Sequence, residues 1–315
     1  MAKARDKRWE ATSGDIILGK VGVVTVTYNS SIVLQDFLRS LDQQSYQDFI
    51  VIAVDNASKD DTIEQLHSWN SPKLVLIENS TNQGVAEGNN QGIRFALDAG
   101  CEHVLLLNND VVFGEDLFQR LLGGLQVHSC QMTTPLTYYN EQPDVVWCAG
   151  GIFERKYGYR SMHIGDGEKD VGQFVQPRAV EYVPTCCVMI QRKVFDRIGL
   201  MDERYFVYSD DTDFMYRAMR AGLRMFLLPD AKLWHKVSSL TGGNESDFTR
   251  YYSARGRALF LAKHFGALAG AAWAISYSVF YPLRALIGKD SWNQAHVRVK
   301  GILEGYKVGR KSYEA

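Results

Sequence analysis

Cysteine is scarce in this sequence and does not occur in a bonding pattern. The 315 residues contain five cysteines, an odd number, of which Cys186 and Cys187 are adjacent, and no C-x-x-C pair is present. A disulfide framework or a structural zinc site needs more regular spacing than this. We therefore expect small, buried thiols in a protein of a reducing compartment.

Net charge is also almost absent. The chain has 35 Lys and Arg against 36 Asp and Glu, which gives a formal charge of −1. A protein that wraps nucleic acid needs a clear basic surplus, so we expect no nucleic-acid partner. Residues 1–20 are polar, lack the apolar core of a secretory signal, and are expected to form a short mobile tail on a cytoplasmic protein.

Several nucleotide and nucleophile motifs are missing. No G-x-G-x-x-G follows the first predicted strand, no Walker A sequence occurs, and there is no G-x-S-x-G elbow. These absences disfavour a nicotinamide dehydrogenase and a P-loop NTPase. What the chain does have is 46% apolar and 12% aromatic residues, which excludes disordered and collagen-like classes and allows one large domain or two smaller ones.

The first third of the chain alternates short β-branched runs with segments of helical periodicity. This alternation predicts an α/β fold, with a mostly parallel sheet flanked by helices. The predicted strands are 21–26, 49–54, 74–77 and 104–107, and the predicted helices are 32–42, 60–69 and 86–99.

Polar residues follow each of these strands. Because ligands of open α/β sheets bind outside the carboxyl ends of the strands, we expect these residues to surround a ligand. The alternative is that they only form turns, which Asn, Asp and Gly favour. The residues in question are Thr27 and Asn29, Asp55 and Asn56, Glu78 and Asn79, and Asn109 and Asp110.

The pattern becomes less regular after Leu125. Residues 131–182 are expected to form loops and short antiparallel strands, and 188–190 to return to the sheet. Helices are predicted over 192–198 and 211–221, and a strand over 224–228 that ends at a Pro-Asp turn.

From Tyr251 onward the sequence is helical, basic and apolar, and residues 265–283 carry no charge. Three interpretations are open for this segment. It lies in a membrane surface, it packs on the domain or on a partner, or it spans a membrane, since about 20 apolar residues suffice for a span.

Two acidic motifs are candidates for chemistry. Asp110, after a buried strand, is suited to holding Mg²⁺ or Mn²⁺, although a turn-capping aspartate is the plain alternative. Asp210, Asp211 and Asp213 crowd one helix start, where they cap the helix or provide a general base with a raised pKa. His235 alone is a weak signal for a ligand role.

Taken together, these segments resemble family 2 glycosyltransferases of the GT-A fold, and within them the bacterial rhamnosyltransferase-like branch. The similar segments occur in family order and cover roughly 21–264. They are VVTVTYNS (23–30), VDNASKDDT (54–62), ENSTNQGVAEGNNQGI (78–93), LLLNND (105–110), YFVYSDDTDFMYRAMRAGLRMFLLPDAKLWHK (205–236) and YYSARGRALFLAKH (251–264).

The resemblance implies inverting transfer of a sugar from a nucleotide-sugar to an acceptor hydroxyl. Asp211 then corresponds to the catalytic base, and Asp110 with His235 to the site of a divalent metal, Mg²⁺ or Mn²⁺. The residues that the resemblance assigns to substrate and nucleotide binding are Thr27, Asn29, Asp55, Asn82, Gly84, Asn89, Asn109, Asp210 and Asp213.

Two positions depart from the family pattern. Asn108 replaces the first acid of the metal motif, which predicts a weaker metal site, and Asp210 shortens the usual Glu of the Glu-Asp pair by one methylene. A non-catalytic nucleotide-sugar-binding scaffold is therefore the alternative function, and a nicotinamide oxidoreductase is a more distant one.

The resemblance also predicts the domain organisation and the partners. After the tail of 1–20, we expect a nucleotide-sugar-binding half (21–125), an acceptor-binding and catalytic half (126–245), and a C-terminal helical segment (246–315) that associates peripherally with a membrane. The expected donor is a dTDP-, UDP- or GDP-sugar, with dTDP-rhamnose the first choice. The expected acceptor is a glycan or lipid-linked glycan at the inner face of the cytoplasmic membrane.

Overall fold

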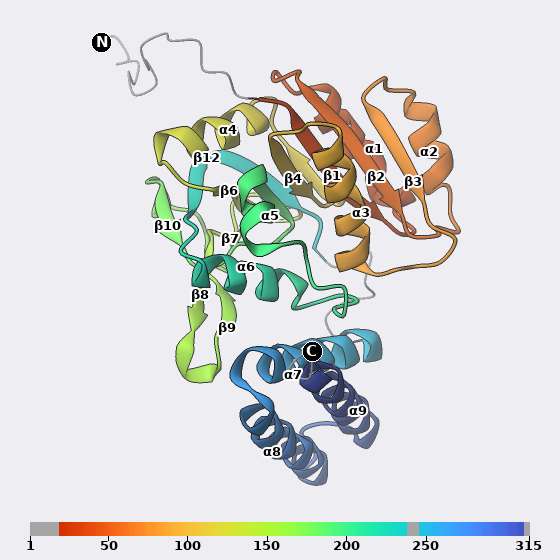
Figure 1. Cartoon of the computed structure of the whole chain (residues 1–315), viewed down its shortest axis with the longest axis vertical. Helices are drawn as coiled ribbons and strands as arrows, with labels where there is room; N and C mark the ends of the chain where they lie inside the picture. The colour runs from red at the N-terminus through yellow and green to blue at the C-terminus, as the bar shows by residue number, and fades with distance from the viewer. Residues whose placement is uncertain (1–18, 238–245, 312–315) are drawn as a thin grey trace.

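The computed structural model describes residues 19–237 and 246–311. A large mixed sheet with helices on both faces forms the upper part of the molecule, and a unit of three packed helices forms the lower end (Figure 1). The α/β architecture and the helical C-terminal segment predicted from the sequence are thereby confirmed. The predicted tail lies outside the described residues, apart from its last two.

The predicted parallel strands form one half of the sheet. Their order is β3-β2-β1-β4, with all neighbours parallel. Each strand agrees with its predicted range to within one residue at either end. The strands are β1 (Val21–Thr27), β2 (Phe49–Asp55), β3 (Leu74–Glu78) and β4 (His103–Leu107).

The other half of the sheet is mixed. Strand β11 pairs antiparallel with both β4 and β6, and β6 pairs parallel with β12. Strands β5 and β10 add to β12, β7 adds to β6, and β8 and β9 form a separate hairpin with a short 3₁₀ helix (Arg155–Tyr157) between them. The bounds are β5 (Val111–Phe113), β6 (Met132–Tyr139), β7 (Val146–Cys148), β8 (Gly151–Glu154), β9 (Arg160–His163), β10 (Arg178–Val180), β11 (Cys187–Gln191) and β12 (Met225–His235).

Two sequence-based expectations in this half are wrong. Residues 132–139 form the central strand β6, and β12 does not end at Pro229 but runs on to His235. The register explains both errors. Leu228 pairs with Pro135 while Lys232 pairs with the next residue of β6, so three residues of β12 bulge out beside a proline that lacks an N–H. The bulge lets a proline-containing segment occupy the sheet interior.

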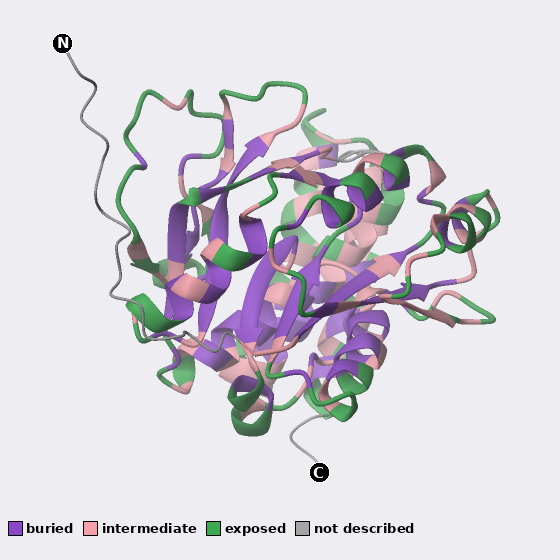
Figure 2. Ribbon diagram, turned by 90° about the horizontal axis from the view of Figure 1, so that it is seen from above, coloured by how far each residue is buried: buried purple, intermediate pink, exposed green. Residues whose placement is uncertain are grey.

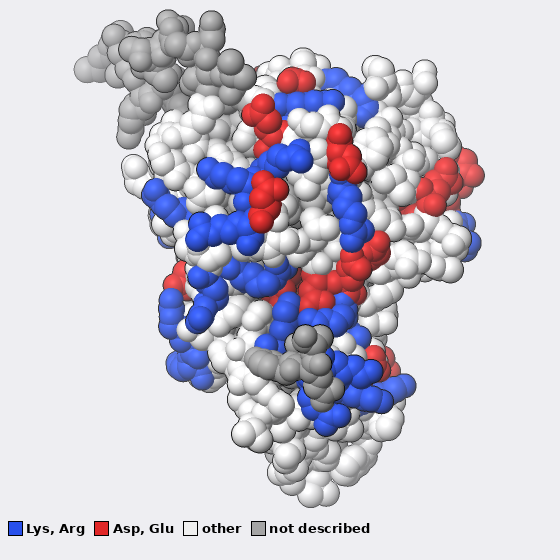
Figure 3. All heavy atoms as spheres, in the orientation of Figure 1, with Lys and Arg blue, Asp and Glu red and all other residues white. Residues whose placement is uncertain are grey.

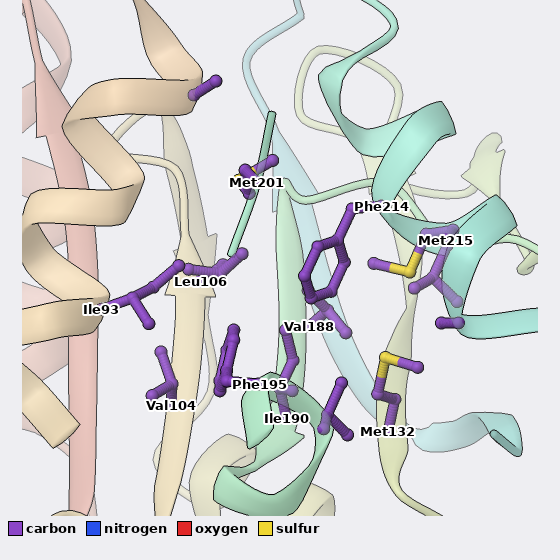
Figure 4. Close-up of a cluster of buried hydrophobic side chains, with 14 of the residues drawn as sticks. Ile93, Val104, Leu106, Met132, Val188, Ile190, Phe195, Met201, Phe214 and Met215 are labelled. Carbon is purple, nitrogen blue, oxygen red and sulfur yellow. The ribbon is translucent and has the colours of Figure 1, made fainter. Parts of the chain in front are cut away.

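Side chains alternate between two cores, one on each face of the sheet. Along β4, Val104 and Leu106 join one cluster while Leu105 and Leu107 join the other. Figure 2 shows the central strands mostly buried and the outer surfaces of the helices exposed. Figure 4 shows the first core, with Ile93 of α3 at one side, Phe214 of α6 at the other, and Leu106 and Phe195 between them. Strands that are covered on both faces have nearly continuous apolar sequences, as the strands of this sheet do.

Helices from different parts of the chain cover the two faces. Residues of α1, α2 and α4 pack in one core, and residues of α3, α5, α6 and α7 pack in the other. The helices on the sheet are α1 (Ser31–Asp42), α2 (Thr62–Trp69), α3 (Val85–Asp98), α4 (Leu117–Val127), α5 (Arg192–Ile198) and α6 (Asp210–Arg220).

The C-terminal unit consists of α7 (Asp247–Phe265), α8 (Ala267–Leu286) and α9 (Trp292–Arg310). No helix within the described residues is both long and apolar enough to cross a membrane, so the spanning interpretation of 265–283 is wrong. Glycines 301, 305 and 309 of α9 face α7 at close range: a Cβ on Gly305 would lie 2.1 Å from the carbonyl oxygen of Arg255. Only glycine permits this backbone approach.

Replacing Gly305 by alanine tests the close packing of α9 on α7. We expect Gly305→Ala to lower the free energy of unfolding by about 1–3 kcal/mol, because the added methyl overpacks the contact. The measurement is urea denaturation followed by circular dichroism. The matched control is Gly123→Ala in α4, where nothing lies within 4 Å of the added Cβ and a gain of about 0.5–1 kcal/mol is expected. Equal effects of the two changes would contradict the packing argument.

Candidate active site

A cavity of about 610 Å³ opens at the carboxyl ends of β1, β2 and β4. This is the edge at which the sequence predicts a ligand, and the predicted residues Asn82, Gly84, Asn89, Asn109 and Asp110 line it. The full lining is Val26, Tyr28, Asn56, Asn82, Gly84, Val85, Asn89, Leu107, Asn108, Asn109, Asp110, Phe206, Val207, Phe248 and Tyr252.

One wall of the cavity is polar and built from interlocked amides. Asn56 donates from Nδ2 to the carbonyl oxygen of Gly84 at 3.0 Å, and Asn82 accepts from the Gly84 N–H at 2.9 Å. Gly84 has φ +84°, and a Cβ there would lie 2.5 Å from the Phe206 carbonyl oxygen. The loop between β3 and α3 is thus held against residue 206, and no other residue type fits that position without strain.

A second part of the lining is aromatic and comes partly from the C-terminal unit. Phe206 stacks on Tyr252 of α7 with ring centroids 5.0 Å apart, and Phe248 packs on Tyr252 at 4.6 Å. Such a surface is suited to the flat face of a nucleobase, while the amides of the same cavity supply hydrogen bonds. The contribution of α7 was not anticipated from the sequence, although Tyr252 lies in one of the segments that carry the family resemblance.

Three predicted nucleotide-binding residues support the cavity without lining it. Thr27 donates its hydroxyl to Asp55 Oδ1 at 2.8 Å, and the N–H of Ser58 donates to Asp55 Oδ2 at 2.9 Å. Asn29, at φ +49°, accepts from the N–H of Lys59 at 2.8 Å. Asp55 is fully buried, so these contacts fix the loop after β2 and orient its neighbour Asn56 toward the cavity.

The tertiary structure brings Asp110 and His235 together. Strand β12 pairs antiparallel with β5, so that His235 lies opposite Val111, next to Asp110 in sequence. His235 Nε2 is 3.2 Å from Asp110 Oδ1, and both side chains are about nine-tenths buried. Burial alone lowers the pKa of His235, but Cys186 and Asp110 outweigh it and raise that pKa to about 10. Contact with Asp110 therefore favours the protonated form of the ring.

These residues fit a divalent metal for which the protein supplies a few ligands and the substrate supplies the others. Asn109 Oδ1 and His235 Nδ1 are buried and make no hydrogen bond, and buried Asp110 Oδ1 has His235 Nε2 as a neighbour at 3.2 Å. Within the described part of the chain, no group of three or more His, Cys, Asp or Glu side chains could hold a metal by itself. Mg²⁺ is commonly held by one or two carboxylates together with substrate phosphates, so a small protein ligand set is compatible with such a site.

The predicted base Asp211 lies at the start of α6 and is held at both oxygens. The Tyr182 hydroxyl donates to Oδ2, and the Thr212 N–H donates to Oδ1 at 2.6 Å. Burial and the charge of Asp211 raise the pKa of Tyr182 well above its usual range, which keeps the hydroxyl protonated as a donor. The carboxylate is thereby fixed in one orientation.

A chain of aromatic contacts links this carboxylate to the Asp110 pair. Tyr182 stacks on His163 at 5.9 Å, and Trp147 contacts the rings of both His163 and His235, at 4.6 and 4.5 Å. Burial lowers the pKa of His163 even though Asp211 acts in the opposite direction. The two predicted acidic centres therefore belong to one connected site. Trp147, His163 and Tyr182 lie in the irregular region to which the sequence assigned no roles.

The pKa values of the two other acids at the start of α6, Asp210 and Asp213, are shifted in opposite directions. Asp210 is buried, and this burial with the neighbouring Asp211 charge raises its pKa to about 8. Asp213 is fully buried, and despite that burial its pKa is held below the usual range by His264, Lys263 and Arg217. Asp213 therefore ties α6 to α7, and the structure places it outside the cavity.

Comparison with known proteins identifies the family. The model of the family "Glycosyl transferase family 2" matches residues 22–199, more than half of the chain. This chain belongs to glycosyl transferase family 2. It is therefore a glycosyltransferase, as the sequence resemblance implied.

Curated relatives and solved structures agree with this family 2 glycosyltransferase assignment. The chain is 24% identical to the dTDP-rhamnosyl transferase RfbF of Shigella flexneri, over 76% of this chain and 79% of that protein. It is 27% identical to the N-acetylglucosaminyl-diphospho-decaprenol L-rhamnosyltransferase of Mycobacterium tuberculosis H37Rv, over 70% of this chain and 77% of that one. The Pyrobaculum calidifontis mannosyltransferase PcManGT, in complex with GDP-Man and Mn²⁺, has a TM-score of 0.55, 16% identity, and coverage of 94% and 88% of the two chains. The last likeness shows the shared GT-A fold.

Replacing Asp210 tests the raised pKa in this glycosyltransferase. Between the ordinary carboxyl value of 3.8 and about 8, the folded chain keeps a proton that the unfolded chain has lost. The stability that this proton provides is complete below 3.8 and is lost as the pH rises through about 8, at up to about 1.4 kcal/mol per pH unit. We expect Asp210→Asn to remove this slope in urea titrations at pH 5 to about 9. The exposed control Asp230→Asn should retain it, and the same slope in both variants would contradict the assignment.

Proposed function

We propose that this family 2 glycosyltransferase is an inverting enzyme that transfers a sugar, with rhamnose from dTDP-rhamnose the first candidate, to an acceptor hydroxyl. The observation that carries the proposal is the connected site: Asp211 and the Asp110–His235 pair stand at the two ends of one chain of contacts beside a cavity of nucleotide size. The alternative, a scaffold that binds nucleotide-sugar without turnover, has only Asn108 in its favour.

The donor nucleotide occupies the cavity in this proposal. Its base packs on the aromatic wall of Phe206, Phe248 and Tyr252, and the amides of Asn56, Asn82 and Asn89 face its polar groups. The two rhamnosyltransferase relatives support rhamnose as the sugar, and the name of one of them supports the dTDP carrier. UDP- and GDP-sugars remain alternatives that the donor screen below distinguishes.

Asp211 acts as the general base in this mechanism. A hydroxyl is a weak nucleophile until a carboxylate accepts its proton, and such assistance contributes about 10²- to 10⁴-fold. Tyr182 and Thr212 hold the carboxylate in place, and buried Asp210 keeps its proton at neutral pH, which limits repulsion beside the base. Attack on the anomeric carbon from the side opposite the departing diphosphate inverts its configuration.

Asp110 and His235 are the residues that would hold a divalent metal, with Mn²⁺ or Mg²⁺ the candidates. When bound, the metal neutralises the charge that develops on the leaving diphosphate. The Mn²⁺ in the PcManGT structure supports this assignment. A histidine ligand is neutral, so His235 would bind the metal without the proton that Asp110 otherwise favours on its ring. The buried Asn109 Oδ1, which has no hydrogen-bond partner, lies at the same place.

The acceptor is proposed to be a glycan or lipid-linked glycan at the inner face of the cytoplasmic membrane. One rhamnosyltransferase relative is named for a diphospho-decaprenol-linked sugar, which supports a lipid-linked acceptor. Trp147 and His163 lie beside the base and offer an aromatic surface for an acceptor sugar ring. The enzyme then contributes to cell-envelope polysaccharide or glycolipid synthesis.

A donor screen tests the activity directly. Purified protein is incubated with Mn²⁺ or Mg²⁺, membrane extract as acceptor source, and a panel of dTDP-, UDP- and GDP-sugars, and released nucleoside diphosphate is measured. We expect release from one donor and its loss on adding EDTA. Asp211→Asn should lower turnover by about 10²- to 10⁴-fold while donor binding, measured by calorimetry, is kept. The exposed control Asp196→Asn should behave as wild type.

Each other result of the screen has a defined meaning. Release that survives EDTA removes the metal from the proposal and leaves His235 as the charge that faces the diphosphate. Binding of one donor without release, in the presence of acceptor extract, favours the scaffold alternative. Full activity of Asp211→Asn would contradict its role as the base.

Tyr182 is a positioning residue, and its hydroxyl can be removed alone. We expect Tyr182→Phe to lower kcat by about tenfold, since one hydrogen bond to a charged group is lost. The acidic limb of the pH profile of kcat should move to higher pH, because the charged base has lost a donor. Donor KM should not change. Tyr138→Phe, which removes a 2.6 Å hydrogen bond to Asp170, is the matched control, and identical pH profiles for all three proteins would contradict the positioning role.

A further inference from the structure

Helix α8 is built with its small residues inward. Gly270, Ala274 and Ala285 are its buried residues, and a Cβ on Gly270 would lie 2.8 Å from the Cα of Ala262 on α7. Surface helices of globular proteins normally turn their large apolar side chains toward the core. Here small residues make the closest contacts with α7, and three aromatic residues of α8 are half-buried against the C-terminal unit.

Seven other large apolar residues, in α8 and directly after it, are exposed. From 275 to 287 they follow one side of the helix at spacings of three or four residues, with two adjacent pairs, and residue 268 lies two turns earlier on the same side. We call this set the apolar face of α8. Their exposed fractions range from 47% for Phe280 to 90% for Leu268, and Arg284, the one charged residue of the helix, is paired with Asp290. The apolar face consists of Leu268, Ile275, Val279, Phe280, Leu283, Leu286 and Ile287.

This face is larger than the isolated apolar residues found on ordinary surfaces. Scattered exposed apolar side chains are normal, whereas a contiguous stripe along a 20-residue helix marks an interaction surface. Figure 1 places α8 at the free lower end of the molecule, away from the sheet, and the same end is white in Figure 3, with blue Lys and Arg side chains gathered above it.

Charge identifies what covers the face. Residues 246–311 contain 11 Lys and Arg but only 3 Asp and Glu, although the whole chain has a net charge of −1. Pairing two copies through α8 would bring two such basic units together, which like-charge repulsion opposes. A bilayer with anionic headgroups instead complements both the apolar face and its cationic surroundings. Trp292, 62% exposed beside the end of α8, is of the residue type enriched at the bilayer interface.

We propose that the apolar face of α8 inserts into the headgroup region of an anionic lipid bilayer, while exposed basic residues of the C-terminal unit, such as Lys289, Lys300 and Lys307, contact the lipid phosphates. This inference rests on the C-terminal unit alone and holds whatever sugar the enzyme transfers. Docking bears on the active site through α7, because Phe248 and Tyr252 at one end of that helix line the cavity and its other end leads into α8.

Vesicle flotation of the full chain tests the proposal. Vesicles of phosphatidylcholine with 30% phosphatidylglycerol, on the order of typical anionic content, are compared with phosphatidylcholine alone at low and high salt. We expect the wild type to float with the anionic vesicles and to bind neutral vesicles at least about tenfold less, with salt weakening the binding. Val279→Asp/Leu283→Asp should reduce binding to anionic vesicles by at least about tenfold, because it places two charges on the apolar face.

Controls separate lost binding from lost folding and from activity. Val171→Asp alters an exposed apolar residue far from α8 in sequence and should float as wild type does. The double variant should keep its unfolding midpoint and its vesicle-free release of nucleoside diphosphate. Equal flotation of wild type and double variant, or no flotation of the wild type, overturns the proposal. A wild-type dimer in sedimentation that the double variant abolishes, without vesicle binding, assigns the face to a second copy instead.

Discussion

The buried carboxylate of Asp213 is the constraint on which the arrangement of the site depends. Its two oxygens are shared among Arg217 of α6 and Lys263 and His264 of α7, at 2.7–2.9 Å. Arg217 also donates to the carbonyl oxygens of Ile198, the last residue of α5, and of Leu200. One charge cluster thus fixes the helix that carries Asp211 to the helix that supplies the aromatic wall. Removing one partner of such a cluster leaves an uncompensated buried charge, which typically costs about 3–5 kcal/mol.

The sheet supplies the second fixed point of the active site. Parallel strands β1, β2 and β4 deliver amides and Asp110 to one edge, as open α/β sheets do. The bulged strand β12 then crosses beside β5 and delivers His235 to the same edge. The bulge after Leu228 changes the direction and register of β12, and this places His235 next to Asp110. Trp147 fills the space between this pair and the base side of the site.

The C-terminal unit combines two surfaces of opposite character in three helices. The start of α7 provides aromatic side chains to the cavity. Helix α8, which lies away from the sheet, exposes large apolar side chains. Glycines on α9 and small residues on α8 allow close backbone contacts among the three helices, beside a small core around Ile302. The large aliphatic residues of α8 therefore lie on its exposed side.

The sequence by itself determined the family, the α/β class and most of the first half of the sheet, because period-two and period-3.6 patterns and family motifs are local in the chain. It also determined which residues are candidates for the active site. Of these, Asn82, Gly84, Asn89, Asn109 and Asp110 line one cavity. Only the tertiary structure decided that 132–139 is a central strand, that Asp213 is a tie between helices, and that Tyr182, His163 and Trp147 connect the base to His235. Those outcomes depend on contacts between residues far apart in the chain, on a bulge beside a proline, and on which face of α8 finds room to pack, and no local pattern records them.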